Sequence, residues 1–122
     1  MNNLLLIFLG GGLGSLARFG ISELVRANFR SSFPLATFCS NVLSCIILAF
    51  TIAYFSGKAE SNPALKTLII VGFCGGFSTF STFSYETVEL MRSGNMLMAI
   101  ANILISVSVC VVLIWFLARQ TV

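Results

Sequence analysis

The chain has 122 residues, of which 57% are hydrophobic and 9% are charged, and its mean hydropathy is +1.00. Because soluble domains carry roughly a quarter charged residues, this composition excludes a compact soluble domain and a disordered chain. A formal net charge of +3 is too small for a nucleic-acid-binding surface, and the absence of histidine removes the commonest metal ligand and general base. We therefore expect an all-α integral membrane protein. Residues 1–122 should form a single membrane domain without a separate soluble domain.

Four apolar stretches are long enough for transmembrane helices, which need about 20 residues each. The first begins at Leu4 and is interrupted by Arg18 and Glu23, whereas the other three carry no charge over 31–57, 67–85 and 93–118. We expect spans at roughly 4–25, 33–56, 66–90 and 95–118. The opening Met1-Asn2-Asn3 lacks the basic residues of a secretory signal, so we expect the first stretch to be a span.

The basic residues of the connections divide almost evenly between the two sides of such a bundle. If the spans alternate, one side carries Lys58, Lys66 and Arg119, and the other carries Arg26, Arg30 and Arg92 with Arg18 beside them. Since basic residues usually set orientation, the balance indicates either insertion in both orientations, with pairing of opposite copies, or a case in which loop charge predicts poorly. Four short helices also enclose little interior, which favours an oligomer whose subunits share a polar pathway.

In the first stretch, two glycines and an arginine share one face of the expected helix. Gly10, Gly14 and Arg18 follow at four-residue intervals, and a GxxxG pair lets a neighbouring backbone approach closely. An arginine inside a span usually faces water or a partner. Arg18 is expected either to extend its side chain to the membrane surface or to stand at the entrance of an anion pathway.

The second stretch carries a polar stripe at helical spacing, formed by Thr37, Asn41, Ser44 and Cys45. Asn41 is the costly member, because its amide has two donor hydrogens and a carbonyl to satisfy. Asn41 either makes a hydrogen bond between helices or donates to a passing species, and its presence alone favours the former.

The fourth stretch carries a thinner stripe, in which Asn102, Ser106 and Cys110 share a face. The four cysteines of the chain lie in apolar surroundings without CxxC spacing. We therefore expect small packing residues at these positions rather than disulfides or zinc ligands.

The third stretch holds the most informative run, GFCGGFSTFSTFSYE from Gly72 to Glu86. Gly75-Gly76 before a Ser/Thr-rich segment is a poor helix, and a break would free carbonyl oxygens that suit a small cation. Phe80 and Phe83 lie on neighbouring parts of one helix face, and phenylalanine ring edges are electropositive. Five hydroxyl side chains between residues 78 and 84 exceed what lipid-facing phenylalanines and self-bonded hydroxyls would require, which favours an anion pathway.

Together, these motifs resemble the Fluc (CrcB) fluoride channels of microbial membranes over essentially the whole chain. The resemblance is carried by Gly12-x-Gly14-x-x-x-Arg18, by Thr37-x-x-x-Asn41 and above all by the run from Gly72 to Glu86. It implies a fluoride-selective channel that exports fluoride passively from the cytoplasm and gives fluoride resistance. It also implies an antiparallel, dual-topology homodimer in the bacterial cytoplasmic (inner) membrane, with the third helix broken near mid-membrane.

The resemblance further implies the roles of individual residues. Main-chain carbonyls of Gly75 and Ser78 from both subunits would hold a structural sodium ion at the dimer centre. Two fluoride pathways would be lined by Phe80, Phe83, Asn41, Ser81, Thr82, Ser106 and Thr37, with Arg18 at the wide entrance.

Two other functions compete with this one. A small proton-coupled multidrug exporter of dual topology has the same span count, but it needs a carboxylate deep in a span, and Glu23 and Glu86 lie towards span ends. A purely structural membrane partner would use the polar stripes as helix contacts only. An enzyme is not expected, because the sequence has no histidine and no nucleophile with a visible base.

Overall fold

The computed structural model describes residues 2–56 and 62–119, and within these ranges all regular secondary structure is helical. The helices are α1 (Asn3–Asn28), α2 (Leu35–Phe55), α3 (Pro63–Lys66), the π-helix η1 (Thr67–Cys74), α4 (Gly75–Phe77), α5 (Phe80–Arg92) and α6 (Met96–Ala118). Four stretches are long and apolar enough to cross a membrane, namely Asn3–Asn28, Leu35–Phe55, Pro63–Arg92 and Met96–Ala118. The prediction of an all-helical chain with four such stretches is confirmed.

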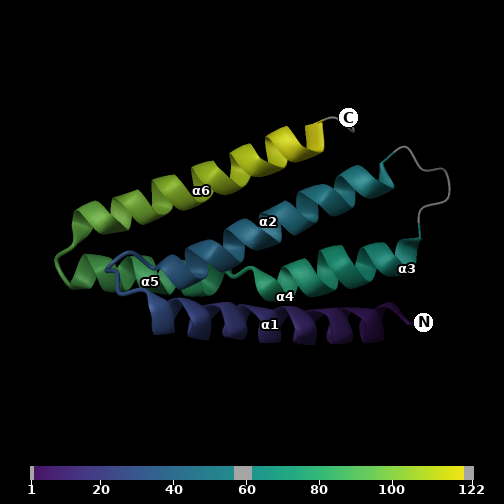
Figure 1. The fold of residues 1–122 in the computed structure, drawn as a ribbon, viewed down its shortest axis with the longest axis horizontal. Helices are drawn as coiled ribbons and strands as arrows, with labels where there is room; N and C mark the ends of the chain where they lie inside the picture. Colours follow the sequence, from purple (N-terminus) through teal and green to yellow (C-terminus); the bar gives the residue numbers. More distant parts are fainter. Residues whose placement is uncertain (1, 57–61, 120–122) are drawn as a thin grey trace.

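The four stretches run back and forth along the long axis of the molecule (Figure 1). The beginning of α1 and the end of α6 therefore lie at the same end, where Lys66 and Arg119 also lie, while Arg26, Arg30 and Arg92 lie at the other. Lys58, the remaining basic residue of the predicted orientation pattern, falls outside the described residues. A further result of this path is that α2 and α6, which pack against each other, run in the same direction.

Helix α1 packs against η1 and α4 through glycine, so that the two backbones touch directly. A Cβ atom added to Gly14 would meet the carbonyl oxygen of Phe73, and one added to Gly76 would meet the carbonyl oxygen of Gly11. By contrast, a Cβ atom on Gly12 would meet nothing within 4 Å. The GxxxG pair of the first stretch thus serves the close helix packing that its spacing predicted.

The third stretch leaves the helical conformation at two residues between α4 and α5. Ser78 (φ −83°, ψ 156°) and Thr79 (φ −151°, ψ 118°) are extended. The N–H and the hydroxyl of Ser78 both donate to the carbonyl oxygen of Cys74, at 3.0 and 2.8 Å, and these bonds close the end of α4. The Thr79 hydroxyl then accepts from the N–H of Thr82 at 3.3 Å and caps the start of α5.

The sequence predicts a poor helix for Gly75-Gly76 with the Ser/Thr-rich segment that follows, and the chain leaves the helix within that segment, at Ser78 and Thr79. Gly75 and Gly76 themselves belong to the three-residue helix α4, and Gly76 packs backbone to backbone against α1. The chain becomes extended two residues later, where serine and threonine side chains can bond the ends of the two helices.

Candidate functional site

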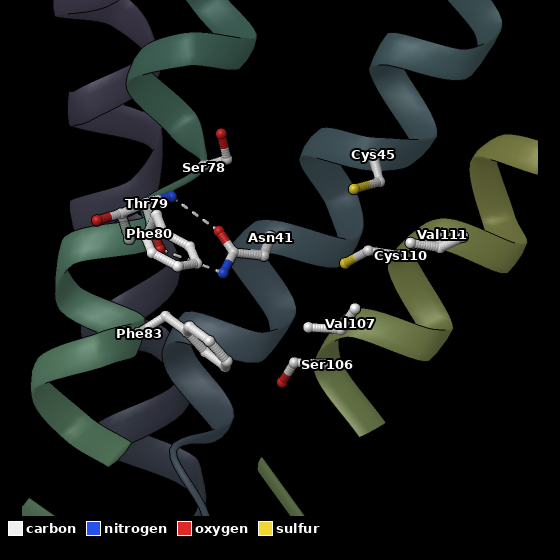
Figure 2. Close-up of a pocket in the computed structure, with 10 residues that line it drawn as sticks. All are labelled: Asn41, Cys45, Ser78, Thr79, Phe80, Phe83, Ser106, Val107, Cys110 and Val111. Atoms are coloured by element: carbon white, nitrogen blue, oxygen red, sulfur yellow. Dashed lines mark hydrogen bonds between the residues drawn. The ribbon is translucent and has the colours of Figure 1, made fainter. Parts of the chain in front are cut away.

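A pocket of about 300 Å³ opens where α2, α5 and α6 meet the extended residues between α4 and α5 (Figure 2). Its lining consists entirely of uncharged residues, namely Asn41, Cys45, Ser78, Thr79, Phe80, Phe83, Ser106, Val107, Cys110 and Val111. Four residues predicted for the ion pathway, Asn41, Phe80, Phe83 and Ser106, therefore come together from three different helices. The pocket is polar at its α2 and extended-segment side and apolar where Val107 and Val111 line it.

Asn41 bonds to the extended backbone at Thr79 through both ends of its amide (Figure 2). Its Oδ1 accepts from the Thr79 N–H at 2.8 Å, and its Nδ2 donates to the Thr79 carbonyl oxygen at 3.4 Å. The second distance is long for such a bond, and Nδ2 carries another hydrogen besides. Asn41 therefore fixes the extended segment and still has donor capacity on the pocket side.

Phe80 and Phe83, the two phenylalanines predicted for the pathway, lie three residues apart at the start of α5. Their ring centroids are 5.8 Å apart and their ring planes are inclined by 41°. The Phe83 ring is buried against the pocket, whereas Phe80 is 77% exposed. Electropositive ring edges are the feature of phenylalanine that suits an anion. The exposure of Phe80 leaves that side of the pocket open.

Behind the pocket, four residues form a continuous chain of hydrogen bonds between α5 and α6. The Ser106 hydroxyl donates to Asn102 Oδ1 at 3.1 Å, and Asn102 Nδ2 donates to the Thr87 hydroxyl at 2.9 Å. Thr87 in turn donates to the carbonyl oxygen of Phe83 at 2.8 Å. Asn102 is 1% exposed. This chain links two pocket residues, Ser106 and Phe83, and sets the position of α5 relative to α6.

The carbonyl oxygens around α4 differ in how many hydrogen bonds they accept. The Cys74 carbonyl accepts from Ser44 Oγ at 3.1 Å as well as from both donors of Ser78. In a continuing helix the Thr79 N–H would bond the Gly75 carbonyl, but here it donates to Asn41 instead. The Gly75 carbonyl thus loses its helical partner, and the residue is exposed. A hard cation could use such an oxygen, and no group of three or more metal-binding side chains occurs within residues 2–56 and 62–119.

The remaining predicted residues lie outside the pocket lining. Ser81 is exposed on the first turn of α5, Thr82 is half-buried beside it, and Thr37 is buried on α2 one turn before Asn41. Arg18 is half-buried on α1, and its Nε has no hydrogen-bond partner among the described residues. The structure therefore brings Asn41, Phe80, Phe83 and Ser106 of the predicted set together in one pocket and leaves the other predicted residues outside its lining.

A second, smaller pocket of about 160 Å³ lies at the end of the molecule where α1 ends. It is lined by residues of α1, the connection to α2, the start of α2 and α5, among them Arg26 and Glu86. The Glu86 Oε1 atom is buried and has no hydrogen-bond partner in the described part of the chain, whereas Arg26 pairs with Glu23 at 3.1 Å. Glu86 therefore stands apart from the first pocket.

Sequence reasoning missed several contributors to the first pocket. The sequence presents Thr79 only as one of five hydroxyl residues, whereas in the structure its backbone is the hydrogen-bond partner of Asn41. Cys45 and Cys110 were expected to be packing residues, yet both line the pocket. The spacing did contain a signal, because Cys45 lies four residues after Asn41 and Cys110 four residues after Ser106, on the same helix faces.

Comparisons with known proteins agree on one family. The family described as "CrcB-like protein, Camphor Resistance (CrcB)" matches residues 5–117. The chain is 42% identical over 123 residues to the "Fluoride-specific ion channel FluC" of Shewanella sp. (strain ANA-3), covering 100% of this chain and 97% of that protein. It is 36% identical to the protein of that name from Coxiella burnetii (strain CbuK_Q154), over 93% and 92% of the two chains. A third, from Serratia proteamaculans (strain 568), is 41% identical over 88% and 84%.

Proposed function

Because this chain belongs to the CrcB family, we propose that it is a fluoride-specific ion channel of a bacterial membrane, with the pocket between α2, α5 and α6 as part of its pathway. It is a multi-pass membrane protein and not an enzyme. The observation that carries the site is the convergence of Asn41, Phe83 and Ser106 from three helices on one uncharged pocket. Flow would be passive and would lower the fluoride concentration of the cytoplasm, which gives fluoride resistance.

The chemistry of the pocket suits a compact, strongly hydrated anion. Fluoride gives up its water only where short donors replace it, and Asn41 and Ser106 supply an amide N–H and a hydroxyl. The ring edges of Phe80 and Phe83 add weak positive electrostatic potential without a fixed charge. Because conduction requires binding weak enough for release, a lining without lysine or arginine favours flow over retention.

We further propose that the channel is an antiparallel, dual-topology homodimer. Over the full sequence the basic residues of the two ends number three against three or four, which gives little preference for one orientation. The open side of the pocket at Phe80 would be closed by a second subunit, which would also bring Ser81 and Thr82 of one chain near the pathway of the other. Cysteine cross-linking between oppositely oriented copies would test this arrangement, and a monomer that conducts fluoride would contradict it.

The extended residues Ser78 and Thr79 lie midway between Pro63 and Arg92, which supports a third span that is interrupted near the middle of the membrane. The main-chain carbonyls of Gly75 and Ser78 would hold a structural sodium ion there, at the contact between subunits. The diversion of the Thr79 N–H to Asn41 fits this use, since it leaves the Gly75 carbonyl without its helical partner. The ion would supply a positive charge that orients these carbonyl dipoles. Dimers that stay equally stable when sodium is replaced by a large organic cation would contradict the proposal.

The competing functions have less support. A proton-coupled drug exporter needs a carboxylate in its central pocket, but the pocket between α2, α5 and α6 contains none, and Glu86 lies in a separate pocket.

The proposal also places the channel in the bacterial inner membrane and has it export fluoride from the cytoplasm, because fluoride resistance requires flow out of the cell.

The test is fluoride efflux from liposomes that contain the purified protein, measured with a fluoride electrode. Valinomycin supplies the compensating potassium flow, so rapid fluoride release under valinomycin and slow release without it would identify an electrogenic pathway. The same experiment with chloride-loaded liposomes measures selectivity. Folded protein that releases no fluoride, or that releases chloride equally fast, would refute the proposed function.

A further inference from the structure

Two cysteine thiols face each other across the pocket, one from α2 and one from α6 (Figure 2). Cys45 and Cys110 both line the pocket, and both are free cysteines. Since α2 and α6 run in the same direction, the pair stands one helical turn beyond Asn41 and Ser106, which face the same pocket. This pairing follows from matching positions on two parallel helices.

The pair has no third metal-binding side chain beside it. Within residues 2–56 and 62–119, no group of three or more His, Cys, Asp or Glu side chains could hold a metal ion. Zinc requires about four ligands in structural sites, so the pair does not suit it. The next cysteine, Cys74, lies near Cys45, but it is absent from the pocket lining and its thiol donates to the Ser44 carbonyl at 3.8 Å. The site therefore suits a soft cation that prefers two thiolates in a linear arrangement.

The net charge of the complex distinguishes between the soft cations that bind two thiolates in this way. Two thiolates with a divalent ion form a neutral complex, whereas two thiolates with silver(I) or copper(I) keep one negative charge. No charged residue lines the pocket to offset such a charge, and burying an uncompensated charge is costly. We propose that Cys45 and Cys110 form a binding site for mercury(II). Each thiol releases one proton as its sulfur binds the ion, and no oxidation or reduction takes place.

Binding at this site would obstruct the pocket. A bridging ion would stand about 6 Å along the helices from Asn41 and Ser106, since four residues separate each pair at about 1.5 Å per residue. It would also tie α2 to α6 by covalent metal–sulfur bonds. The binding itself is independent of the transported species, whereas the block of fluoride flow rests on the proposed function.

The first experiment measures binding by intact-mass spectrometry of the full-length protein in detergent. One equivalent of mercury(II) chloride is added, and an excess of 2-mercaptoethanol is then used as a competitor. Because a bridging ion must break two bonds to leave, we expect the wild-type protein and the Cys39→Ser control to retain one mercury. The Cys45→Ser and Cys110→Ser variants should lose it to the competitor. Retention by either variant, or loss from the wild type, would overturn the proposal.

The Cys74→Ser variant distinguishes the proposed pair from its nearest alternative. Retention of mercury in this variant supports Cys45 and Cys110 as the ligands, and its loss would assign the site to Cys74 instead. Methylmercury, which binds a single thiol, serves as the control for attachment without bridging, and the competitor should remove it from the wild-type protein.

The second experiment measures fluoride efflux from liposomes before and after mercury treatment and a 2-mercaptoethanol wash. We expect the wild type to fall to the rate of protein-free liposomes and to stay there, while Cys45→Ser and Cys110→Ser recover their own starting rates after the wash. Retained mercury with undiminished flux would overturn the block. An untreated protein without fluoride flux would refute the proposed function, and the mass measurement would still decide the mercury site.

Discussion

Replacing Asn41 with alanine removes both hydrogen bonds that join α2 to the backbone at Thr79. The bond at 2.8 Å satisfies the Thr79 N–H, and an unsatisfied buried donor costs about 1–3 kcal/mol. The bond at 3.4 Å is too long to add much. We therefore expect the Asn41→Ala variant to lose about 1–3 kcal/mol of folding free energy, together with its fluoride flux.

A second substitution separates these two effects. In Asn41→Asp the carboxylate keeps an acceptor for the Thr79 N–H, so the folding free energy should stay near that of the wild type. The same carboxylate has no donor hydrogen and repels an anion. A hydrogen bond to a charged group is worth about 1.5–3 kcal/mol, and 1.4 kcal/mol corresponds to a tenfold change. Loss of the donor alone should therefore slow fluoride flux by roughly 10- to 100-fold.

Two measurements on each variant test this reasoning. Thermal unfolding in detergent reports stability, and valinomycin-driven efflux from liposomes at pH 7.5 reports flux. Ser44→Ala is the matched control, since it removes a different hydrogen bond, between α2 and the last residue of η1, and lies outside the pocket lining. Wild-type flux in Asn41→Asp would refute the donor role of Asn41, and unchanged stability in Asn41→Ala would refute its role in holding the extended segment.

Three further substitutions test other contacts. Phe80→Ile removes an electropositive ring edge and should slow fluoride flux while size-exclusion chromatography shows an unchanged assembly; normal flux would remove Phe80 from the pathway. Gly14→Ala places a Cβ atom on the Phe73 carbonyl and should cost about 1–3 kcal/mol in thermal unfolding, whereas Gly12→Ala should be neutral, and equal effects would contradict the packing argument. Asn102→Ala breaks the chain between α5 and α6 and should cost about 1–3 kcal/mol, so an unchanged melting temperature would argue against that chain.

The four long helices were predictable because apolar length alone selects them. Each stretch is long enough to cross a membrane, and apart from Arg18 in the first stretch the few charged residues lie towards the ends. The close contact of α1 with η1 was also encoded locally, since Gly10 and Gly14 present a face without side chains. In these cases the signal lies within one segment.

The exact position of the extended residues in the third stretch depends on a second segment, so the run itself could not predict it. Gly75 and Gly76 have low helix propensity, yet contact with α1 holds the backbone in a helix. The place where the chain becomes extended is fixed by Asn41, which lies 38 positions earlier in the sequence and bonds the Thr79 backbone. The sequence also does not predict that η1 is a π-helix, because its apolar pattern is the same as that of an α-helix.

The candidate site was predictable to a similar extent. The polar stripes of α2 and α6 pointed to Asn41 and Ser106, and both line the pocket. The partner of Asn102 could not be inferred, because its hydrogen bond to Thr87 depends on how α5 and α6 meet. The same holds for the thiol pair, since one sequence does not reveal that two parallel helices bring their cysteines together.

The direct backbone contact between α1 and η1 also has a mechanical consequence. Helices that meet through side chains can slide past one another, because rotamers rearrange as they move. At Gly10, Gly14 and Gly76 there are no rotamers to rearrange, and any sliding would drive carbonyl oxygens into the opposite backbone. Helix α1 and the first half of the third stretch should therefore move as one stiff body. The contact between α5 and α6 is of a different kind, because it is made through side chains such as Thr87 and Asn102, whose hydrogen bonds and not a backbone clash hold the two helices in place.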